Sequence, residues 1–254
     1  MRESEAFTLW HGDCLEIMKE IPDDSVDMVL CDLPYGTTRN KWDSVIPFNP
    51  LWEQYCRAVK NNGAILLFSQ MPFTASLAAS APDLFRYEWI WEKTQGTGHL
   101  NAKKMPLKAH ENILVFYRNL PTYNPQWGEG LPYIATYSTH SSNYGKQKDN
   151  VTTINDGRRY PTDILRFGKK AGDRYLHPTQ KPVALCEYLI RTYTKEGETV
   201  LDNCMGSGST GVACANTGRN FLGIEQDKSY YEVAKERVAN AYSKWQQKND
   251  RENP

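Results

Sequence analysis

The tetrapeptide Asp32-Leu33-Pro34-Tyr35 combines residue types that can hold a flat, amine-bearing ring. A carboxylate accepts hydrogen bonds from an amine, a proline keeps a turn rigid, and an aromatic side chain stacks on a ring. The tetrapeptide follows an apolar run, residues 26–31, which places it at the end of an expected strand. The alternative is an ordinary turn in which Asp caps, Pro stiffens and Tyr packs. The tetrapeptide alone does not decide between the two interpretations.

A second candidate site is the run Gly206-Ser207-Gly208-Ser209-Thr210-Gly211, which fits the pattern G-x-G-x-x-G. It lies between an expected strand, residues 199–203, and an expected helix, residues 209–217, and Glu225 ends the strand that follows. An acid at this distance commonly binds the hydroxyls of an adenosine ribose. The pattern therefore favours a nucleoside-containing cofactor over a strand-to-helix turn that binds nothing.

Two cofactors compete for this glycine loop, a nicotinamide dinucleotide and S-adenosylmethionine. Asp202 ends the strand before the glycines, where its carboxylate would repel a pyrophosphate and attract the sulfonium and ammonium of S-adenosylmethionine. The loop also comes late in the chain, which leaves too little sequence for the paired halves of a dinucleotide fold. Both observations favour the methyl donor.

Strand and helix patterns alternate on both sides of these motifs, which predicts an α/β fold with a mostly parallel twisted sheet and helices on both faces. Ligands of such sheets bind outside the carboxyl ends of the strands, so both motifs are expected to line one crevice. The expected strands are residues 26–31, 64–68, 86–92, 113–117, 199–203 and 220–225. The expected helices begin at Asp13, near Pro50, and at Pro72, Pro182, Ser209 and Lys228. Glu16 is expected to complete a capping box with Asp13. Asn62-Gly63 is expected to end the helix that begins near Pro50, and Gly197 the helix that begins at Pro182.

Residues 119–175 break this alternation, because Gly, Pro, Asn, Tyr and Ser punctuate them and no amphipathic period persists. Lys and Arg lie among aromatic residues in the second half, which suits phosphate contact and base stacking. The alternative is a solvated loop with a mild excess of positive charge. The basic residues proposed to contact a nucleic acid are Lys146, Lys148, Arg158, Arg159, Lys169 and Lys170.

Composition excludes several classes of protein. The 254 residues carry no net formal charge, so a nucleic acid would be attracted by a local basic patch. No apolar run is as long as a membrane span, and residues 1–5 are unlike a signal peptide. The six cysteines form no Cys-x-x-Cys pair and are expected to be reduced, mostly buried thiols in a cytoplasmic protein. The histidines lack metal-ligand spacing, so no metal is expected.

Taken in their order, the motifs resemble those of the amino-group DNA methyltransferases, which methylate adenine N6 or cytosine N4. Asp32-Leu33-Pro34-Tyr35 resembles the Asp-Pro-Pro-Tyr catalytic motif of that family, residues 177–182 the stretch before its cofactor loop, and residues 202–210 the loop itself. A catalytic motif that precedes the cofactor loop resembles the circularly permuted β arrangement of the family. The resemblance implies an S-adenosylmethionine-dependent, Rossmann-like fold with three parts: a catalytic half (1–118), an inserted target-recognition region (119–175) and a cofactor-binding half (176–254).

The resemblance also implies roles for single residues. Leu33 replaces the usual first proline, which is tolerated because that position acts mainly through its backbone carbonyl. Asn203-Cys204 stands where Pro-Phe is common, so packing under the cofactor is expected to differ. Asp13 and Cys14 would contact the adenine ring of the donor, Thr179, Gln180 and Lys181 its methionine end, and Glu225 its ribose. The full cofactor-binding set is Asp13, Cys14, Asp32, Thr179, Gln180, Lys181, Asp202, Cys204, Gly206, Ser207, Gly208, Ser209, Thr210 and Glu225.

The expected chemistry is a direct methyl transfer to an exocyclic amine. Such an amine is a poor nucleophile, and hydrogen bonds to the Asp32 carboxylate and the Leu33 carbonyl would stabilise the positive charge that develops on it. Pro34 would hold the turn, and Tyr35 would stack on the base after it leaves the duplex. Without a Pro-Cys dipeptide, the chain lacks the nucleophile of cytosine-C5 enzymes, and Cys31 is expected to be a buried strand residue.

An Asp-headed motif is associated mainly with adenine, so the prediction is a site-specific adenine-N6 methyltransferase of double-stranded DNA. An N4-cytosine enzyme, and a methyltransferase of RNA or another amine, remain alternatives. A silent nucleic-acid-binding module and a dehydrogenase fit the motifs less well. Members of the family often dimerise, so a homodimer is a candidate assembly, and a cognate restriction endonuclease is a further candidate partner.

Overall fold

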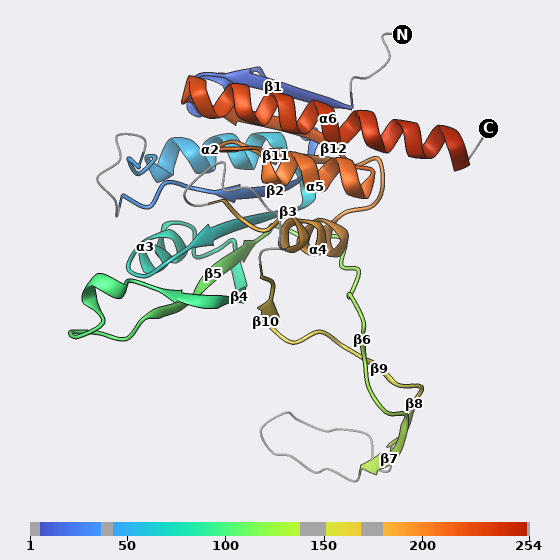
Figure 1. Cartoon of the computed structure of the whole chain (residues 1–254). Coiled ribbons are helices and arrows are strands. Elements are labelled where there is room, and N and C mark those ends of the chain that lie inside the picture. The colour runs from blue at the N-terminus through green and yellow to red at the C-terminus, as the bar shows by residue number, and fades with distance from the viewer. Residues whose placement is uncertain (1–5, 37–42, 138–150, 169–179, 253–254) are drawn as a thin grey trace. The chain divides into compact units, whose positions relative to one another are not determined.

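The computed structural model describes residues 6–36, 43–137, 151–168 and 180–252. Its central sheet has eight strands in the order β1-β12-β11-β2-β3-β5-β4-β10 (Figure 1). Neighbouring strands run parallel except at β5, which is antiparallel to both β3 and β4. The α/β fold with a mostly parallel sheet is therefore confirmed. The strands are β1 (Phe7–His11), β2 (Val26–Asp32), β3 (Val59–Ser69), β4 (Phe85–Thr97), β5 (Lys108–Phe116), β10 (Ile164–Arg166), β11 (Thr199–Asp202) and β12 (Asn220–Glu225).

Helices cover both faces of this sheet, as predicted (Figure 1). Successive side chains of β2 point to opposite faces of the sheet, and each face packs against helices. Met28 and Leu30 pack into the core formed with α4, α5 and α6, whereas Val29 and Cys31 pack into the core formed with α1, α2 and α3. A strand buried on both faces needs apolar residues at nearly every position. The helices are α1 (Cys14–Ile17), α2 (Phe48–Ala58), α3 (Phe73–Ser80), α4 (Val183–Tyr193), α5 (Ser209–Thr217) and α6 (Lys228–Glu252), with 3-10 turns η1 (Met18–Glu20) and η2 (His99–Asn101).

Two predicted helix ends were wrong. Asn62-Gly63 does not end α2, which stops at Ala58, and β3 continues through both residues. The register between β2 and β3 shifts there, and a Cβ at Gly63 would lie 2.8 Å from the carbonyl oxygen of Asp27. The glycine thus lets two strands approach closely at an irregularity in the ladder. Similarly, α4 ends at Tyr193, and Gly197 lies beyond it in the turn to β11 with φ 80°.

The N-terminal end of the described chain also differs in detail from the prediction. Asp13 caps α1, because its Oδ1 accepts a hydrogen bond from the N–H of Leu15 at 2.8 Å. Glu16 does not complete the capping box, since its carboxylate binds Lys19 at 2.7 Å. Strand β1 was not predicted, because only Phe7, Thr8 and Leu9 alternate in polarity and Trp10 breaks the pattern.

Residues 125–162 form a second compact unit, separate from the main body of the chain. The four short strands of this unit were not predicted, because strands of two to five residues are too short to show a detectable alternation of apolar and polar residues. Its aromatic and basic residues pack together: the Trp127 and Tyr160 rings lie 4.3 Å apart, and the guanidinium of Arg158 lies 5.2 Å from the Trp127 ring. Two antiparallel pairs build the unit, β6 (Gly128–Glu129) with β9 (Arg158–Arg159) and β7 (Tyr133–Tyr137) with β8 (Val151–Asn155).

Candidate active site

Two neighbouring strands of the sheet, β2 and β11, run parallel and each ends in an aspartate. The chain proceeds from β2 to β3 on one side and from β11 to β12 on the other, so its direction across the sheet reverses between them. Open α/β sheets bind ligands outside the carboxyl ends of the strands at such a reversal. Asp32 and Asp202 stand at these two ends, and both line one cavity of about 630 Å³. The predicted common crevice is therefore present.

Most of the predicted cofactor and catalytic residues line this cavity. Gly208 does not; it caps α5 in the left-handed conformation with φ 80°. Gln180 does not either, although its Oε1 accepts a hydrogen bond from the Ser207 hydroxyl at 3.4 Å. The predicted residues that line the cavity are Asp13, Cys14, Asp32, Leu33, Pro34, Tyr35, Lys181, Asp202, Cys204, Gly206, Ser207, Ser209, Thr210 and Glu225. Thr179, Lys146, Lys148, Lys169 and Lys170 lie outside the described residues.

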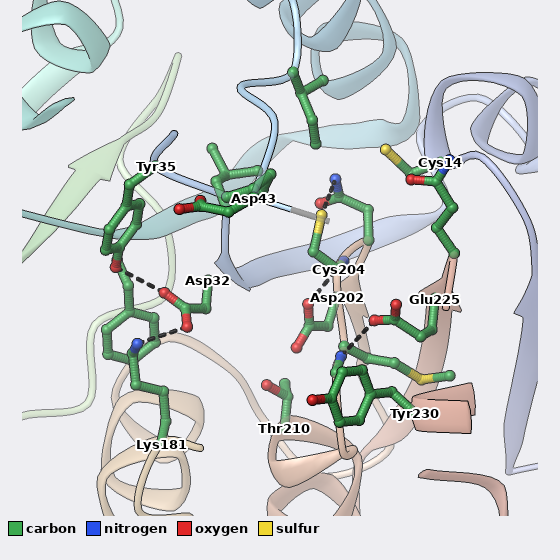
Figure 2. A pocket seen from close by; sticks show the side chains of 18 of the residues that line it. Cys14, Asp32, Tyr35, Asp43, Lys181, Asp202, Cys204, Thr210, Glu225 and Tyr230 are labelled. Carbon is green, nitrogen blue, oxygen red and sulfur yellow. Dashed lines mark hydrogen bonds and ion pairs between the residues drawn. The ribbon is translucent and has the colours of Figure 1, made fainter. Parts of the chain in front are cut away.

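The Asp32 carboxylate is held from two sides (Figure 2). The Tyr35 hydroxyl donates to its Oδ1 at 2.7 Å, and the Lys181 ammonium donates to its Oδ2 at 2.6 Å. Burial raises the pKa of the Asp32 carboxyl, and the positive charge of Lys181 opposes that rise. Lys181 was predicted to reach the methionine end of a cofactor, and the structure places its ammonium on the catalytic motif.

The turn after β2 is fixed by contacts that the sequence did not reveal. Gly36 adopts φ 67°, and its N–H donates to Oδ1 of Asp43 at 2.8 Å. Asp43 is 8% exposed and also lines the cavity. The ring of Tyr35 stacks on that of Phe73, with centroids 5.2 Å apart. Together these contacts define the backbone of the tetrapeptide before any ligand arrives.

Two charged residues of the cavity, Lys93 and Glu111, were missed by the sequence analysis. Glu111 on β5 lies 3.2 Å from the ammonium of Lys181 and 2.6 Å from that of Lys93 on β4. Burial alone would raise the pKa of Glu111, but the two lysines outweigh it and hold the pKa below its ordinary value. A single lysine or glutamate in a strand usually faces solvent, so no sequence signal marks this pair as buried.

The Asp202 carboxyl is buried without a lysine partner such as those of Asp32 and Glu111 among the described residues. Its side chain is 4% exposed, and burial raises its pKa to about 7, against hydrogen bonds from the Thr210 hydroxyl and the backbone of Cys204. The Cys204 N–H donates at 3.1 Å. Both donors are neutral, so the carboxylate has strong unmet affinity for a positive charge. A cationic ligand would suit this position.

Glu225 ties the glycine loop to the end of β12. Its Oε2 accepts from the N–H of Gly206 at 2.8 Å, and its Oε1 accepts from the N–H of Asp227 at 2.8 Å. Burial raises the pKa of this carboxyl. The acid therefore orients the loop as well as lining the cavity.

The unusual Asn203-Cys204 pair is accommodated without a buried unmet polar group. The Tyr55 hydroxyl donates to Oδ1 of Asn203 at 2.7 Å. Burial raises the pKa of the Cys31 thiol to about 12, so it is not a nucleophile at neutral pH, and its prediction as a buried strand residue is confirmed. All six cysteines are free thiols.

Comparison with known proteins identifies this architecture. The DNA methylase family (N6_N4_Mtase) matches residues 26–236. The chain belongs to this family. It is 28% identical to the type II methyltransferase M.HpaI of Haemophilus parainfluenzae over 91% of this chain and 74% of that protein. It is 27% identical to M2.LlaDCHI of Lactococcus lactis subsp. cremoris over 93% of this chain and 90% of that protein.

Solved structures share the fold. The chain matches the M1.HpyAVI–SAM complex with a TM-score of 0.63 and 24% identity, covering 91% of this chain and 99% of that one. It matches the cytosine-N4-specific PvuII DNA methyltransferase with a TM-score of 0.64 and 15% identity, covering 96% and 95%. Among the helices of the described residues, none is long and apolar enough to cross a membrane. The described residues also contain no cluster of His, Cys, Asp or Glu suited to a metal ion.

Proposed function

We propose that this DNA methyltransferase transfers a methyl group to the N6 amino group of adenine in double-stranded DNA, with the target base turned out of the helix. The observation that carries the choice of base is the carboxylate of Asp32 at the end of β2. An aspartate in this position resembles the adenine-directed branch of the family. An amine that becomes cationic in the transition state is stabilised by an anionic acceptor.

The cofactor is S-adenosyl-L-methionine, and it supplies a methyl group activated by a sulfonium centre. The chemistry of the cavity fits it: the buried Asp202 carboxyl has neutral donors and suits a cation, and Glu225 presents a carboxylate near the glycine loop. We assign Asp202 to the cationic part of the donor and Glu225 to its ribose hydroxyls. Asp13 and Cys14 line the same cavity and remain the candidates for the adenine ring.

Each residue of the tetrapeptide Asp32-Leu33-Pro34-Tyr35 then has its own role. The Asp32 carboxylate and the Leu33 carbonyl accept hydrogen bonds from the target amine, and alignment with the methyl group supplies much of the acceleration. The Leu33 side chain is 3% exposed and belongs to the core, so the backbone carbonyl is the chemical group it offers. Pro34 keeps this carbonyl in place, and Tyr35 supplies an aromatic surface for the flipped base.

DNA contact is assigned to residues 125–162 together with the basic residues that follow. Arg158 lies against Trp127, and the guanidinium of Arg159 lies 4.9 Å from the ring of Tyr133. Guanidinium groups beside aromatic rings suit phosphate contact and stacking on nucleobases. Lys146, Lys148, Lys169 and Lys170 are also proposed to contact DNA.

The test is incubation of the purified protein with methyl-labelled S-adenosylmethionine and mixed-sequence duplex DNA, followed by digestion to nucleosides and mass spectrometry. We expect N6-methyladenine, and we expect none with Asp32→Ala. Label on N4-methylcytosine would reassign the target base. Label confined to RNA, or no label on any nucleic acid, would refute the proposal.

Sequencing that detects methylated bases, applied to DNA from cells that express the protein, would locate the sites. A consistent short sequence around each modified adenine is expected. Scattered modification without a common sequence would contradict a site-specific enzyme.

A further inference from the structure

Lys181 is shared by two carboxylates that come from different strands. Its ammonium lies 2.6 Å from Oδ2 of Asp32 and 3.2 Å from Oε2 of Glu111. The side chains are mostly buried, 8% exposed for Lys181 and 11% for Glu111. Oε2 of Glu111 is buried, and its 3.2 Å contact with Lys181 is longer than the 2.6 Å contact of Lys181 with Asp32, so Glu111 can accept a closer contact from the lysine. A second carboxylate acceptor therefore stands next to the lysine.

The proposed reaction requires an acceptor that is already engaged. Oδ1 of Asp32 accepts from Tyr35, and Oδ2 accepts from Lys181 (Figure 2). An entering amine needs one of these oxygens, and an ammonium on the carboxylate also cancels the negative charge that would stabilise the transition state. Displacement of Lys181 into an apolar surrounding would be costly, since a buried unpaired ammonium loses its solvation.

Glu111 removes the cost of displacing Lys181 from Asp32, because it offers the ammonium a second carboxylate. Lys93 binds Oε1 of Glu111 at 2.6 Å and favours its ionised form, while Oε2 faces the ammonium of Lys181 at 3.2 Å. Tyr35 is the poorer candidate for displacement, because its ring is held by stacking on the ring of Phe73. The geometry thus distinguishes which of the two partners of Asp32 leaves.

We propose that Lys181 is a positioning residue that holds Asp32 before the target base binds and moves onto Glu111 when the target amine takes its place at Oδ2. The lysine remains paired throughout, and its departure exposes the negative charge of Asp32 to the amine. This role rests on the proposed function, because it assigns a target amine to Asp32.

The ionisation of Asp32 depends on all the groups around it. Lys181 favours the carboxylate, and burial disfavours it. Several titratable and charged groups face Asp32. They are Cys31 on β2, Tyr35 in the turn after it, Glu111 on β5 with its partner Lys93 on β4, Lys181 just before α4, Cys186 on α4, and Asp202 on β11. Removal of the Lys181 ammonium should raise the pKa of Asp32 further.

The first experiment compares pH–rate profiles of kcat/KM for Lys181→Met, Lys181→Arg and Glu111→Gln. In Lys181→Met we expect the acid limb to move to higher pH by at least one unit, with activity recovering as pH rises, and Lys181→Arg should restore most of the original profile. Glu111→Gln should lower kcat at least tenfold with less than a twofold change in KM for S-adenosylmethionine. A matched control is Lys60→Met, which removes a lysine paired with Asp27 at 2.7 Å elsewhere on the sheet.

An unshifted acid limb in Lys181→Met, or unchanged kcat in Glu111→Gln, would overturn the proposal. Uniform loss of activity at every pH in Lys181→Met would do the same, since it would indicate a purely structural role.

The second experiment needs neither DNA nor donor. Lys181→Met leaves Asp32 facing Glu111 without the shared cation and should lower Tm at pH 8, whereas the added change Glu111→Gln should recover part of that loss. A double variant no more stable than Lys181→Met would refute the shared position of Lys181. If wild-type protein labels no nucleic acid, the proposed function fails, and the order of these Tm values still decides whether the lysine is shared.

Discussion

Replacement of Asp202 by asparagine should stabilise the protein without donor at neutral pH and abolish its preference for a cationic ligand. Asparagine has nearly the same shape and keeps an oxygen that accepts from the N–H of Cys204. The substitution therefore removes the charge and leaves the packing. Its effect on stability can be worked out, because burial raises the pKa of Asp202 to about 7 from an ordinary value of 3.8.

The sign of the pH dependence of the free energy of unfolding follows from the number of protons bound by the folded and unfolded states. Between about pH 4 and pH 7 the folded protein keeps a proton on Asp202 that the unfolded chain has lost, so the free energy of unfolding falls as pH rises through this window. Above pH 7 both states are ionised and the loss is complete. A difference of about three pH units corresponds to about 4 kcal/mol, of which about 2.5 kcal/mol is lost between pH 5 and pH 8.

The assay is urea unfolding of wild-type protein and Asp202→Asn at pH 5, 6, 7 and 8, followed by tryptophan fluorescence. The difference between the two free energies of unfolding should grow by about 2.5 kcal/mol in favour of the variant across this range. Asp83→Asn, which changes an exposed carboxylate, is the control and should show no such trend. A difference that stays constant with pH would refute the argument that Asp202 is held at a cost to stability.

The same variant tests why that cost is retained. A donor at 100 times its Kd stabilises wild-type protein by about 2.7 kcal/mol at pH 7. Under the same conditions Asp202→Asn should gain far less. Equal stabilisation of both proteins would show that the carboxylate does not contact the cation.

Three further predictions concern the donor, the glycine loop and the second unit. Isothermal titration calorimetry should show donor binding to wild-type protein about five times weaker at pH 6 than at pH 7, because fewer Asp202 carboxyls are ionised at pH 6, and no such change in Asp202→Asn. Gly208→Ala should lower the free energy of unfolding by about 1–3 kcal/mol, because its Cβ would lie 3.1 Å from that of Ala234 at φ 80°. Gly197→Ala, with the same φ and open space around it, measures the backbone strain alone. Trp127→Ala should weaken duplex binding in fluorescence anisotropy about tenfold and leave the donor Kd unchanged; unchanged duplex affinity would exclude stacking by this ring.

The position of the site could be predicted from the sequence because its determinants are local. Asp32 and Asp202 each follow an apolar run directly, and a parallel sheet brings such strand ends to the same edge. The glycine pattern adds a left-handed residue, Gly208, which opens α5. Each of these signals needs only a few neighbouring residues, and the order of strands does the rest.

The charged network around Asp32 could not be predicted in this way. Asp32 and Lys181 are 149 positions apart, and Glu111 and Lys93 meet them only because β5 runs antiparallel beside β4 and β3. Burial of a lysine or a glutamate depends on the partner it finds, so the residue type alone predicts an exposed side chain. The prediction that Asn62-Gly63 ends a helix was wrong for a related reason. In the sequence, a glycine that permits a close approach between strands cannot be distinguished from one that ends a helix.

The two aspartates at the ends of β2 and β11 illustrate how neighbouring carboxylates acquire different tasks. Both are withdrawn from water, which favours their neutral forms. Asp32 contacts a lysine, which favours its charged form, and this charge can be presented to a neutral amine that becomes positive only during the reaction. Asp202 contacts neutral donors, so its charge is completed only by a ligand that arrives already positive. The order of events follows: a cationic donor suits the site at Asp202 as it stands, whereas the target amine must first displace the cation at Asp32.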